Sequence, residues 1–314
     1  MLSRIRRYRF AGLVLVTTFA VALVFGACAK AQDEAEPNEE QNATQAEEPA
    51  ADEGGAGEEA PKVAKTEVWP FFRGPNGNGR GPAQDIPVSW DEDSEENIIW
   101  KADLPLLGPN SPLIWKNKVF LTAGDARTRK ILAFNAHTGE QLWEKEYPDT
   151  GANNDLMVDG EYMYASPTGV VTADYVVSHF ANGDVVCHNH DGELQWAKNL
   201  TDTSANMYGQ SCSLTRLKDT VICQLDDGIS VHLYGLNIKT GEQVWKGELE
   251  DNISWASPIT AETSPGKHQV LIGASPFAAG YDATNGKQLW YVDVLGGDMA
   301  PSPLFVDGKA IFMF

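Results

Sequence analysis

A short pattern that recurs four times limits the possible folds of this chain more than any other feature. Residues 135–143 read NAHTGEQLW, residues 237–245 read NIKTGEQVW, and residues 282–290 read DATNGKQLW. A shortened copy, HDGELQW, ends at Trp196. The four tryptophans lie 53, 49 and 45 residues apart, which is typical of propeller blades with four strands each. The sequence therefore predicts an all-β fold, a β-propeller.

The residues before each copy indicate the earlier strands of a blade. Small residues, which suit the crowded centre of a propeller, open an inner strand at residues 111–114, 165–167, 211–214, 256–259 and 301–304. A second strand, rich in β-branched and aromatic residues, follows at residues 119–121, 175–177, 221–223 and 270–272. A third strand leads into a Thr-Gly or Asp-Gly turn, and the fourth strand carries the tryptophan.

The repeated tryptophans are predicted to be structural. A large ring at a fixed place in each blade can dock between successive blades, where it buries the wide apolar face of a sheet. The turn glycine of each copy tolerates a positive φ. The predicted docking residues are Trp143, Trp196, Trp245 and Trp290, with Gly139, Gly192, Gly241 and Gly286.

The two ends of the repeat array are incomplete. Residues 98–101 read IIWK and resemble a fourth strand whose three earlier strands are missing. The last residue, Phe314, falls within the second strand of a fifth unit. Because propellers avoid open sheet edges by closing, residues 98–104 are expected to complete a last blade. We therefore expect a truncated propeller of about four blades, a partial fifth and an N-terminal closing strand.

The N-terminus indicates export. Arg4, Arg6, Arg7 and Arg9 precede an uncharged, apolar run over residues 11–29, as in a signal peptide. A permanent membrane anchor is the alternative, but such an anchor needs ~20 apolar residues and this run is slightly short.

Residues 24–28, VFGAC, resemble the lipobox of bacterial lipoproteins, in which the cysteine is acylated and becomes the mature N-terminus. Phe25 departs from the usual leucine. The resemblance implies lipidation at Cys28, a signal peptide over residues 1–27, and a lipid anchor in a membrane of the cell envelope or periplasm. Ordinary cleavage after Ala29 or Ala31 is the alternative, because both positions end an A-x-A pattern.

Charge separates a linker from the body of the protein. Residues 31–60 contain eleven acidic residues and no Lys or Arg, so residues 28–65 are predicted to be a disordered acidic linker. Residues 66–314, the predicted propeller, hold 17 basic and 33 acidic residues. Such a negative surface repels polyphosphate, which argues against nucleic-acid binding.

The cysteines leave two interpretations open. With Cys28 lipidated, Cys187, Cys212 and Cys223 remain, so at least one has no partner within the chain. Cys212 and Cys223 are expected on adjacent strands, where one disulfide is feasible. Small, buried thiols are the alternative.

Residues 135–143 and 237–245 resemble the tryptophan-docking motif of the pyrroloquinoline-quinone (PQQ) propeller family. Ala133, Asn135, Thr138, Gly139 and Trp143 match that motif position by position. The superfamily includes quinoprotein alcohol dehydrogenases and BamB-like envelope lipoproteins. Residues 69–79, WPFFRGPNGNG, resemble the opening of a bacterial BamB-like subgroup. The resemblance covers residues 69–314 and is specific for fold.

The dehydrogenases of that superfamily would imply PQQ on the propeller axis, a calcium ion, an acidic base and a disulfide between adjacent cysteines. No adjacent cysteines exist here. Asp226 and Asp227 are better explained as a solvated Asp-Asp-Gly turn than as calcium ligands. His188 and His190 have a spacing that suits two metal ligands, but a third is not identifiable. We therefore predict no catalytic, cofactor-binding or metal-binding residues.

The leading hypothesis is a non-enzymatic, BamB-like scaffold that binds other, unidentified envelope proteins and requires no cofactor. The alternative is a PQQ-dependent oxidoreductase, with calcium, whose catalytic residues lie outside this sequence. A sugar- or peptide-binding propeller is a third hypothesis.

Overall fold

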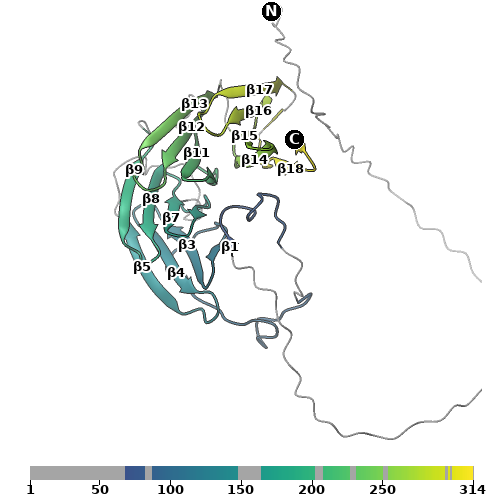
Figure 1. The fold of residues 1–314 in the computed structure, drawn as a ribbon. Coiled ribbons are helices and arrows are strands. Elements are labelled where there is room, and N and C mark those ends of the chain that lie inside the picture. The colour runs from purple at the N-terminus through teal and green to yellow at the C-terminus, as the bar shows by residue number, and fades with distance from the viewer. Residues whose placement is uncertain are drawn as a thin grey trace, which may run out of the picture. The chain divides into compact units, whose positions relative to one another are not determined.

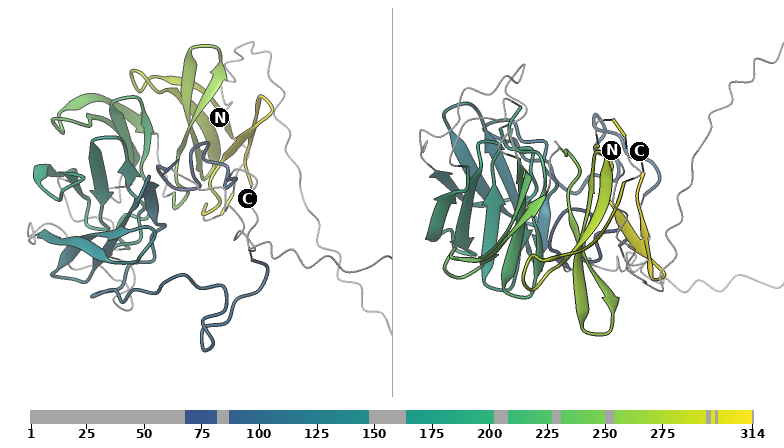
Figure 2. Two further views of the ribbon diagram at one scale, coloured as in Figure 1. Left: turned by 60° about the horizontal axis from the view of Figure 1, so that its bottom comes forward. Right: turned by 90° about the horizontal axis from the view of Figure 1, so that it is seen from above.

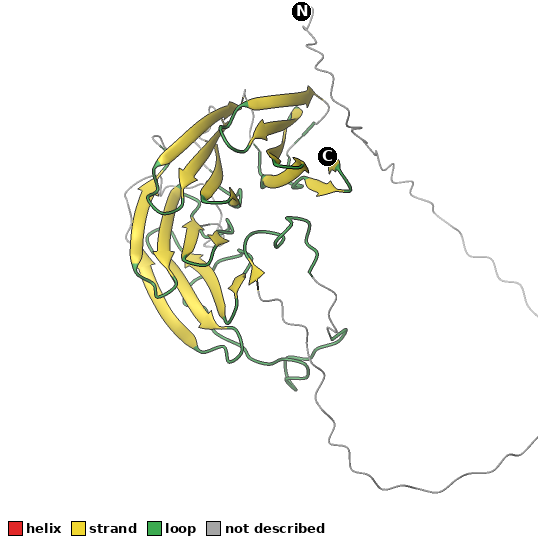
Figure 3. Cartoon of the chain, viewed as in Figure 1, coloured by secondary structure: helices red, strands yellow, loops and turns green. Residues whose placement is uncertain are grey.

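The structure is a computed structural model that describes residues 68–81, 87–147, 164–201, 208–226, 231–249, 254–293, 296–297 and 299–313. Every regular element within these ranges is a β-strand (Figure 3). None of the described residues belongs to a helix that could cross a membrane. The expectations for Cys28, the signal peptide and the acidic linker concern residues outside these ranges.

The first two blades are antiparallel sheets whose strands pair in chain order (Figure 1). The first blade contains β1 (Val68–Trp69), β2 (Leu113–Trp115), β3 (Lys118–Gly124), β4 (Arg129–Asn135) and β5 (Gln141–Tyr147). The second blade contains β6 (Val170–Val171), β7 (Tyr175–His179), β8 (Asp184–Asn189) and β9 (Leu194–Asn199).

The remaining blades repeat this arrangement, and Figure 2 shows them from two further sides. The third blade contains β10 (Thr215–Leu217), β11 (Thr220–Asp226), β12 (Val231–Asn237) and β13 (Gln243–Leu249). The fourth contains β14 (Ile259–Ser264), β15 (Lys267–Ala274), β16 (Phe277–Asp282) and β17 (Gln288–Asp293). A partial fifth blade contains β18 (Leu304–Val306) and β19 (Lys309–Ile311). The predicted propeller of four-stranded blades is confirmed.

A small residue and a register shift accompany each repeated tryptophan. The residues opposite these tryptophans are Ala133, Cys187, Gly235 and Gly280, and the ladder shifts register directly after each of them. A Cβ added at Gly235 would collide with the ring of Trp245. The tryptophan ring therefore lies across its own neighbouring strand and needs a small residue beneath it.

The closing segment differs from the expectation. Residues 98–104 form no strand, since a strand requires a ladder partner and no described residue pairs with this segment. Trp100 nevertheless takes a docking position, because its Nε1 donates to the Ala136 carbonyl over 3.0 Å. An added strand that the sequence did not suggest is β1, which pairs with the inner strand of the first blade.

Candidate functional site

The turns before the fourth strands share one geometry. In the first blade the Asn135 Oδ1 accepts hydrogen bonds from the amides of His137 and Thr138, at 2.8 and 3.3 Å. Gly139 then adopts a φ of 71°. Asn237 and Gly241 repeat the arrangement in the third blade, where Gly241 has a φ of 70°. Each turn thus exposes a flat glycine face.

These flat faces receive tryptophan rings from the preceding part of the chain. The rings of Trp100, Trp143, Trp196 and Trp245 lie against Gly139, Gly192, Gly241 and Gly286, in that order. The Nε1 atoms of Trp143 and Trp196 donate to the carbonyls of His190 and Ile238, over 3.0 and 2.8 Å. Trp290 instead donates to Gln269 within its own blade and meets the ring of Phe312. The contacts of Trp100, Trp143, Trp196 and Trp245 give these rings a structural role.

A chain of hydroxyl groups joins the inner edges of the blades. In each of the first four blades, the residue two positions before the inner strand donates its backbone amide to the side-chain hydroxyl of the equivalent residue in the next blade. The four hydrogen bonds are Ser111 N to Thr168 Oγ1 (2.9 Å), Thr168 N to Ser213 Oγ (3.1 Å), Ser213 N to Ser257 Oγ (2.9 Å) and Ser257 N to Ser302 Oγ (3.1 Å). The small residues that the sequence analysis placed at the inner strands therefore bond blade to blade.

Residues 68–79, named here the inner segment, lie along these same inner edges. They begin with β1 on the first blade and end near the fourth and fifth blades, where the Arg73 guanidinium reaches the carbonyl of Ser302. Gly77 lies against Ile259, which begins the inner strand of the fourth blade.

The described residues show no prepared site for the PQQ and calcium of the alternative hypothesis. The resemblance would place PQQ on the axis, where the inner segment lies across part of the inner edges and bonds to them, as the Pro70 carbonyl does to the Val171 amide. No three His, Cys, Asp or Glu side chains among the described residues gather as a metal site.

The buried thiols and the buried imidazole form a cluster between the second and third blades. The Nδ1 of His179 lies 3.1 Å from the Cys212 carbonyl, and its Nε2 lies 3.9 Å from the Cys223 sulfur. Burial lowers the pKa of His179 to about 4 and raises the pKa of Cys212 to about 12. Both groups are therefore uncharged near neutral pH, and no thiolate is available for nucleophilic chemistry.

The described cysteines Cys187, Cys212 and Cys223 are all free and buried. The structure thus agrees with the interpretation as small buried thiols and not with a Cys212–Cys223 disulfide. Cys212 lies before β10 and not on it, so the two cysteines are not cross-strand neighbours.

Asp226 does not lie in the solvated turn that the sequence predicted, and the two histidines singled out in the sequence occupy structural places. Asp226 ends β11 and is buried, and its backbone bonds both to and from the side-chain amide of Gln210. Asp227 lies outside the described residues. His190 Nε2 lies 2.8 Å from the Thr172 carbonyl, while His188 packs beside the ring of Trp143.

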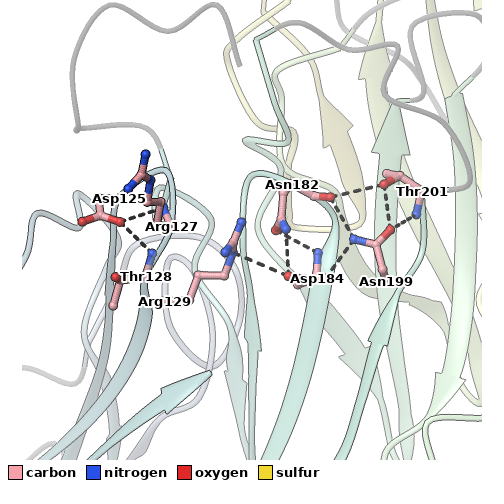
Figure 4. A network of polar contacts seen from close by, with 8 residues as sticks. All are labelled: Asp125, Arg127, Thr128, Arg129, Asn182, Asp184, Asn199 and Thr201. Carbon is pink, nitrogen blue, oxygen red and sulfur yellow. Dashed lines mark hydrogen bonds and ion pairs between the residues drawn. The ribbon is translucent and has the colours of Figure 1, made fainter. Parts of the chain in front are cut away.

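A buried ion pair that the sequence analysis missed joins the first and second blades (Figure 4). The Arg129 Nε lies 3.5 Å from the Asp184 Oδ2, and both side chains are at most 1% exposed. Asn182 and Asn199 donate to the two carboxylate oxygens over 2.7 and 2.8 Å. The sequence pattern of a strand does not reveal such an ion pair, because Arg129 and Asp184 are far apart along the chain.

An aromatic pair stands at the end of the sheets where one blade connects to the next, here named the connecting end. Tyr208 precedes the third blade and Trp255 precedes the fourth, and their rings meet edge to face at 5.7 Å. Tyr208 is 47% exposed, while Trp255 is half-buried. Aromatic side chains that are partly open to solvent are suited to binding surfaces.

The repeated blades, docking turns and inner hydroxyl chain define a β-propeller of the PQQ-like class. The model of one protein family, described as outer membrane protein assembly factor BamB, matches residues 88–225 and 163–312. These matches cover more than half of the chain. The protein therefore belongs to this BamB-like propeller family.

Solved structures show the same fold at low sequence identity. A quinohemoprotein alcohol dehydrogenase from Pseudomonas putida HK5 is 13% identical, with a TM-score of 0.50 over 67% of this chain and 39% of that chain. The corresponding enzyme from Comamonas testosteroni is 14% identical, with a TM-score of 0.50 over 65% of this chain and 39% of that chain. BamB from Moraxella catarrhalis is 17% identical, with a TM-score of 0.47 over 67% and 58%.

The chain spans less than two thirds of the length of each of these structures. No curated protein matches it.

Acid is expected to destabilise the fold through His179. Its pKa is about 4 in the folded protein against 6.5 in the unfolded chain, so the unfolded state binds the extra proton between these pH values. Stability should fall by up to about 3 kcal/mol as pH drops through that window. In His179→Asn this part of the loss should be absent, while His137→Asn, at an exposed position, should behave as the parent. Urea unfolding at a series of pH values measures the difference, and equal slopes for both variants would contradict it.

Proposed function

We propose that this protein is an exported, lipid-anchored propeller of the bacterial cell envelope that binds other envelope proteins as a scaffold. Membership of a family described as an outer membrane protein assembly factor supports this role. The observation that carries the proposal is the aromatic pair at the connecting end, in which the exposed Tyr208 meets the half-buried Trp255. Tyrosine and tryptophan dominate the binding energy of protein interfaces.

The buried side chains support the same proposal. His179 and Cys212 are held uncharged by burial, and the Arg129–Asp184 pair is closed by neighbouring amides. These groups stabilise contacts between blades, which is a structural role.

A photo-crosslinking residue placed at position 208 is expected to capture a discrete envelope protein in living cells. The same residue at position 291 is the control, because Tyr291 is also exposed, at 57%, but lies on the outer strand β17. Adding Trp255→Ser should reduce capture at position 208 by roughly thirtyfold, as expected for a loss of about 2 kcal/mol at a central aromatic residue. Equal capture at both positions, or none at position 208, would count against the proposal.

The oxidoreductase alternative is tested by titration of the purified full-length protein with PQQ and calcium. The scaffold proposal predicts no saturable binding, because residues 68–79 lie across part of the inner edges and no described group of side chains would hold calcium. Saturable binding together with alcohol-dependent reduction of a dye would replace the scaffold proposal by the enzyme.

Lipidation is tested at Cys28. Labelling of cells with a fatty-acid analogue should mark the parent protein and should be lost in Cys28→Ala. Cys223→Ser, which changes a buried thiol, should keep the label. A label that persists in Cys28→Ala would show that the lipid, if any, is attached elsewhere.

A further inference from the structure

The inner segment, residues 68–79, contacts the first, second, fourth and fifth blades and an apolar cluster shared by the second and third, although it forms only one strand of two residues. Val68 and Trp69 pair with Trp115 and Ile114 of the first blade, and the Pro70 carbonyl accepts a 2.8 Å hydrogen bond from the Val171 amide of the second. Further along the segment, Phe71 packs on an apolar cluster that the second and third blades share, and Gly77 and Arg73 contact the fourth and fifth blades.

Each of these later contacts uses a different kind of recognition. Phe71 packs against an apolar cluster that includes Leu214, next to the inner strand of the third blade. The backbone at Gly77 runs so close to Ile259 that an added Cβ would lie 3.4 Å from its Cγ2. The Arg73 Nη1 donates to the Ser302 carbonyl over 3.4 Å. Strand pairing and an apolar anchor are common means by which a protein binds a peptide, and the guanidinium of Arg73 adds a polar contact.

The inner segment also holds its own shape. Arg73 and Gly74 both have positive φ, 63° and 76°, and the Gly79 amide returns to the Arg73 carbonyl over 2.8 Å. Gly74 lies on the ring of Trp69, where an added Cβ would be 2.7 Å from the ring. The segment is therefore a compact turn that fits the inner edges as a unit.

We propose that the inner edges of the blades are a binding site for a peptide, and that residues 68–79 are its resident ligand. The ligand chemistry is an aromatic residue that ends a short strand, a second apolar anchor and an arginine followed by glycine. Bound in this way, the segment links the first blade to the fifth, across the three blades between them.

The proposal is tested on the full chain by inserting a protease recognition site between residues 82 and 86. After cleavage the N-terminal fragment is expected to stay bound, and the Val171 amide to remain protected from hydrogen exchange. A labelled synthetic peptide of residues 66–81 should then exchange into the cleaved protein and not into the uncleaved one, where the resident segment competes at high effective concentration.

Two peptide variants form a matched pair. Gly74→Ala and Gly79→Ala both place alanine at a positive φ, of 76° and 72°, but only Gly74 faces a ring, and Gly79 has no atom within 4 Å of an added Cβ. The Gly74→Ala peptide should compete at least roughly tenfold more weakly than the Gly79→Ala peptide. Equal competition, or entry of the labelled peptide into uncleaved protein, would overturn the proposal. Immediate loss of the fragment on cleavage would overturn it too, whether the body stays folded or unfolds.

Discussion

Replacing Asp184 by Asn is expected to lower the free energy of unfolding by about 3–5 kcal/mol. The carboxylate is fully buried and receives three donors, the Arg129 Nε and the side-chain amides of Asn182 and Asn199. An asparagine offers one oxygen in place of two and turns an NH₂ group toward a donor. It also leaves the guanidinium charge of Arg129 buried without its counter-charge, which is the main cost.

Glu95→Gln is the matched control for this prediction. Glu95 and Lys101 are also 3.5 Å apart, but their side chains are 69% and 46% exposed. An exposed ion pair is worth about 0–1 kcal/mol, so this variant should unfold almost as the parent does. Urea unfolding followed by tryptophan fluorescence compares the two. A loss below about 1 kcal/mol for Asp184→Asn would show that the buried charge is already solvated.

The fold could be predicted from the sequence because its signal is repeated. Each copy of the docking motif places Gly at a turn and Trp on the next strand, and the structure contains a four-stranded blade for every one of the four copies. The first and last residues of the inner strands were harder to predict. The strand β6 begins at Val170, beyond residues 165–167 where small residues indicated it, because Thr168 is used in the hydroxyl chain between blades.

The sequence did not predict features that depend on contacts between different blades. The pair of Arg129 and Asp184 lies on different blades, and neither residue belongs to the repeated motif. The inner segment was noted only for its resemblance, since its contacts depend on where five distant inner strands come together. Residues 98–104 were predicted to form a strand because they carry the tryptophan typical of a fourth strand. They form none, since they have no ladder partners among the described residues.

The aromatic pair illustrates the same limit at the connecting end. Tyr208 and Trp255 are far apart in sequence, and neither lies in a motif. They meet because two successive blades bring equivalent connecting segments together. Repeats therefore predict the scaffold, while the surface that the scaffold presents depends on single residues in the connections between blades.

Gly241→Ala is expected to destabilise the protein by about 3 kcal/mol, because the substitution combines backbone strain with overpacking. Gly241 has a φ of 70°, and an added Cβ would lie 2.6 Å from Cδ2 and 2.7 Å from Cε3 of the Trp196 ring. The ring cannot easily withdraw, since its Nε1 is bonded to the Ile238 carbonyl over 2.8 Å. Gly266→Ala separates the two costs, because Gly266 has a φ of 73° and no atom lies within 4 Å of an added Cβ there.

The control should therefore lose only the backbone term, about 1 kcal/mol. The difference between the two variants, measured by urea unfolding, isolates the contact between the second and third blades. If the docking turn holds these blades together, Gly241→Ala should also expose the indole of Trp196 to a fluorescence quencher, which Gly266→Ala should not. Equal losses of stability in both variants would show that the ring and the glycine face are not in tight contact. In that case the two blades would depend mainly on the inner hydroxyl chain, where the Thr168 amide donates to the Ser213 hydroxyl.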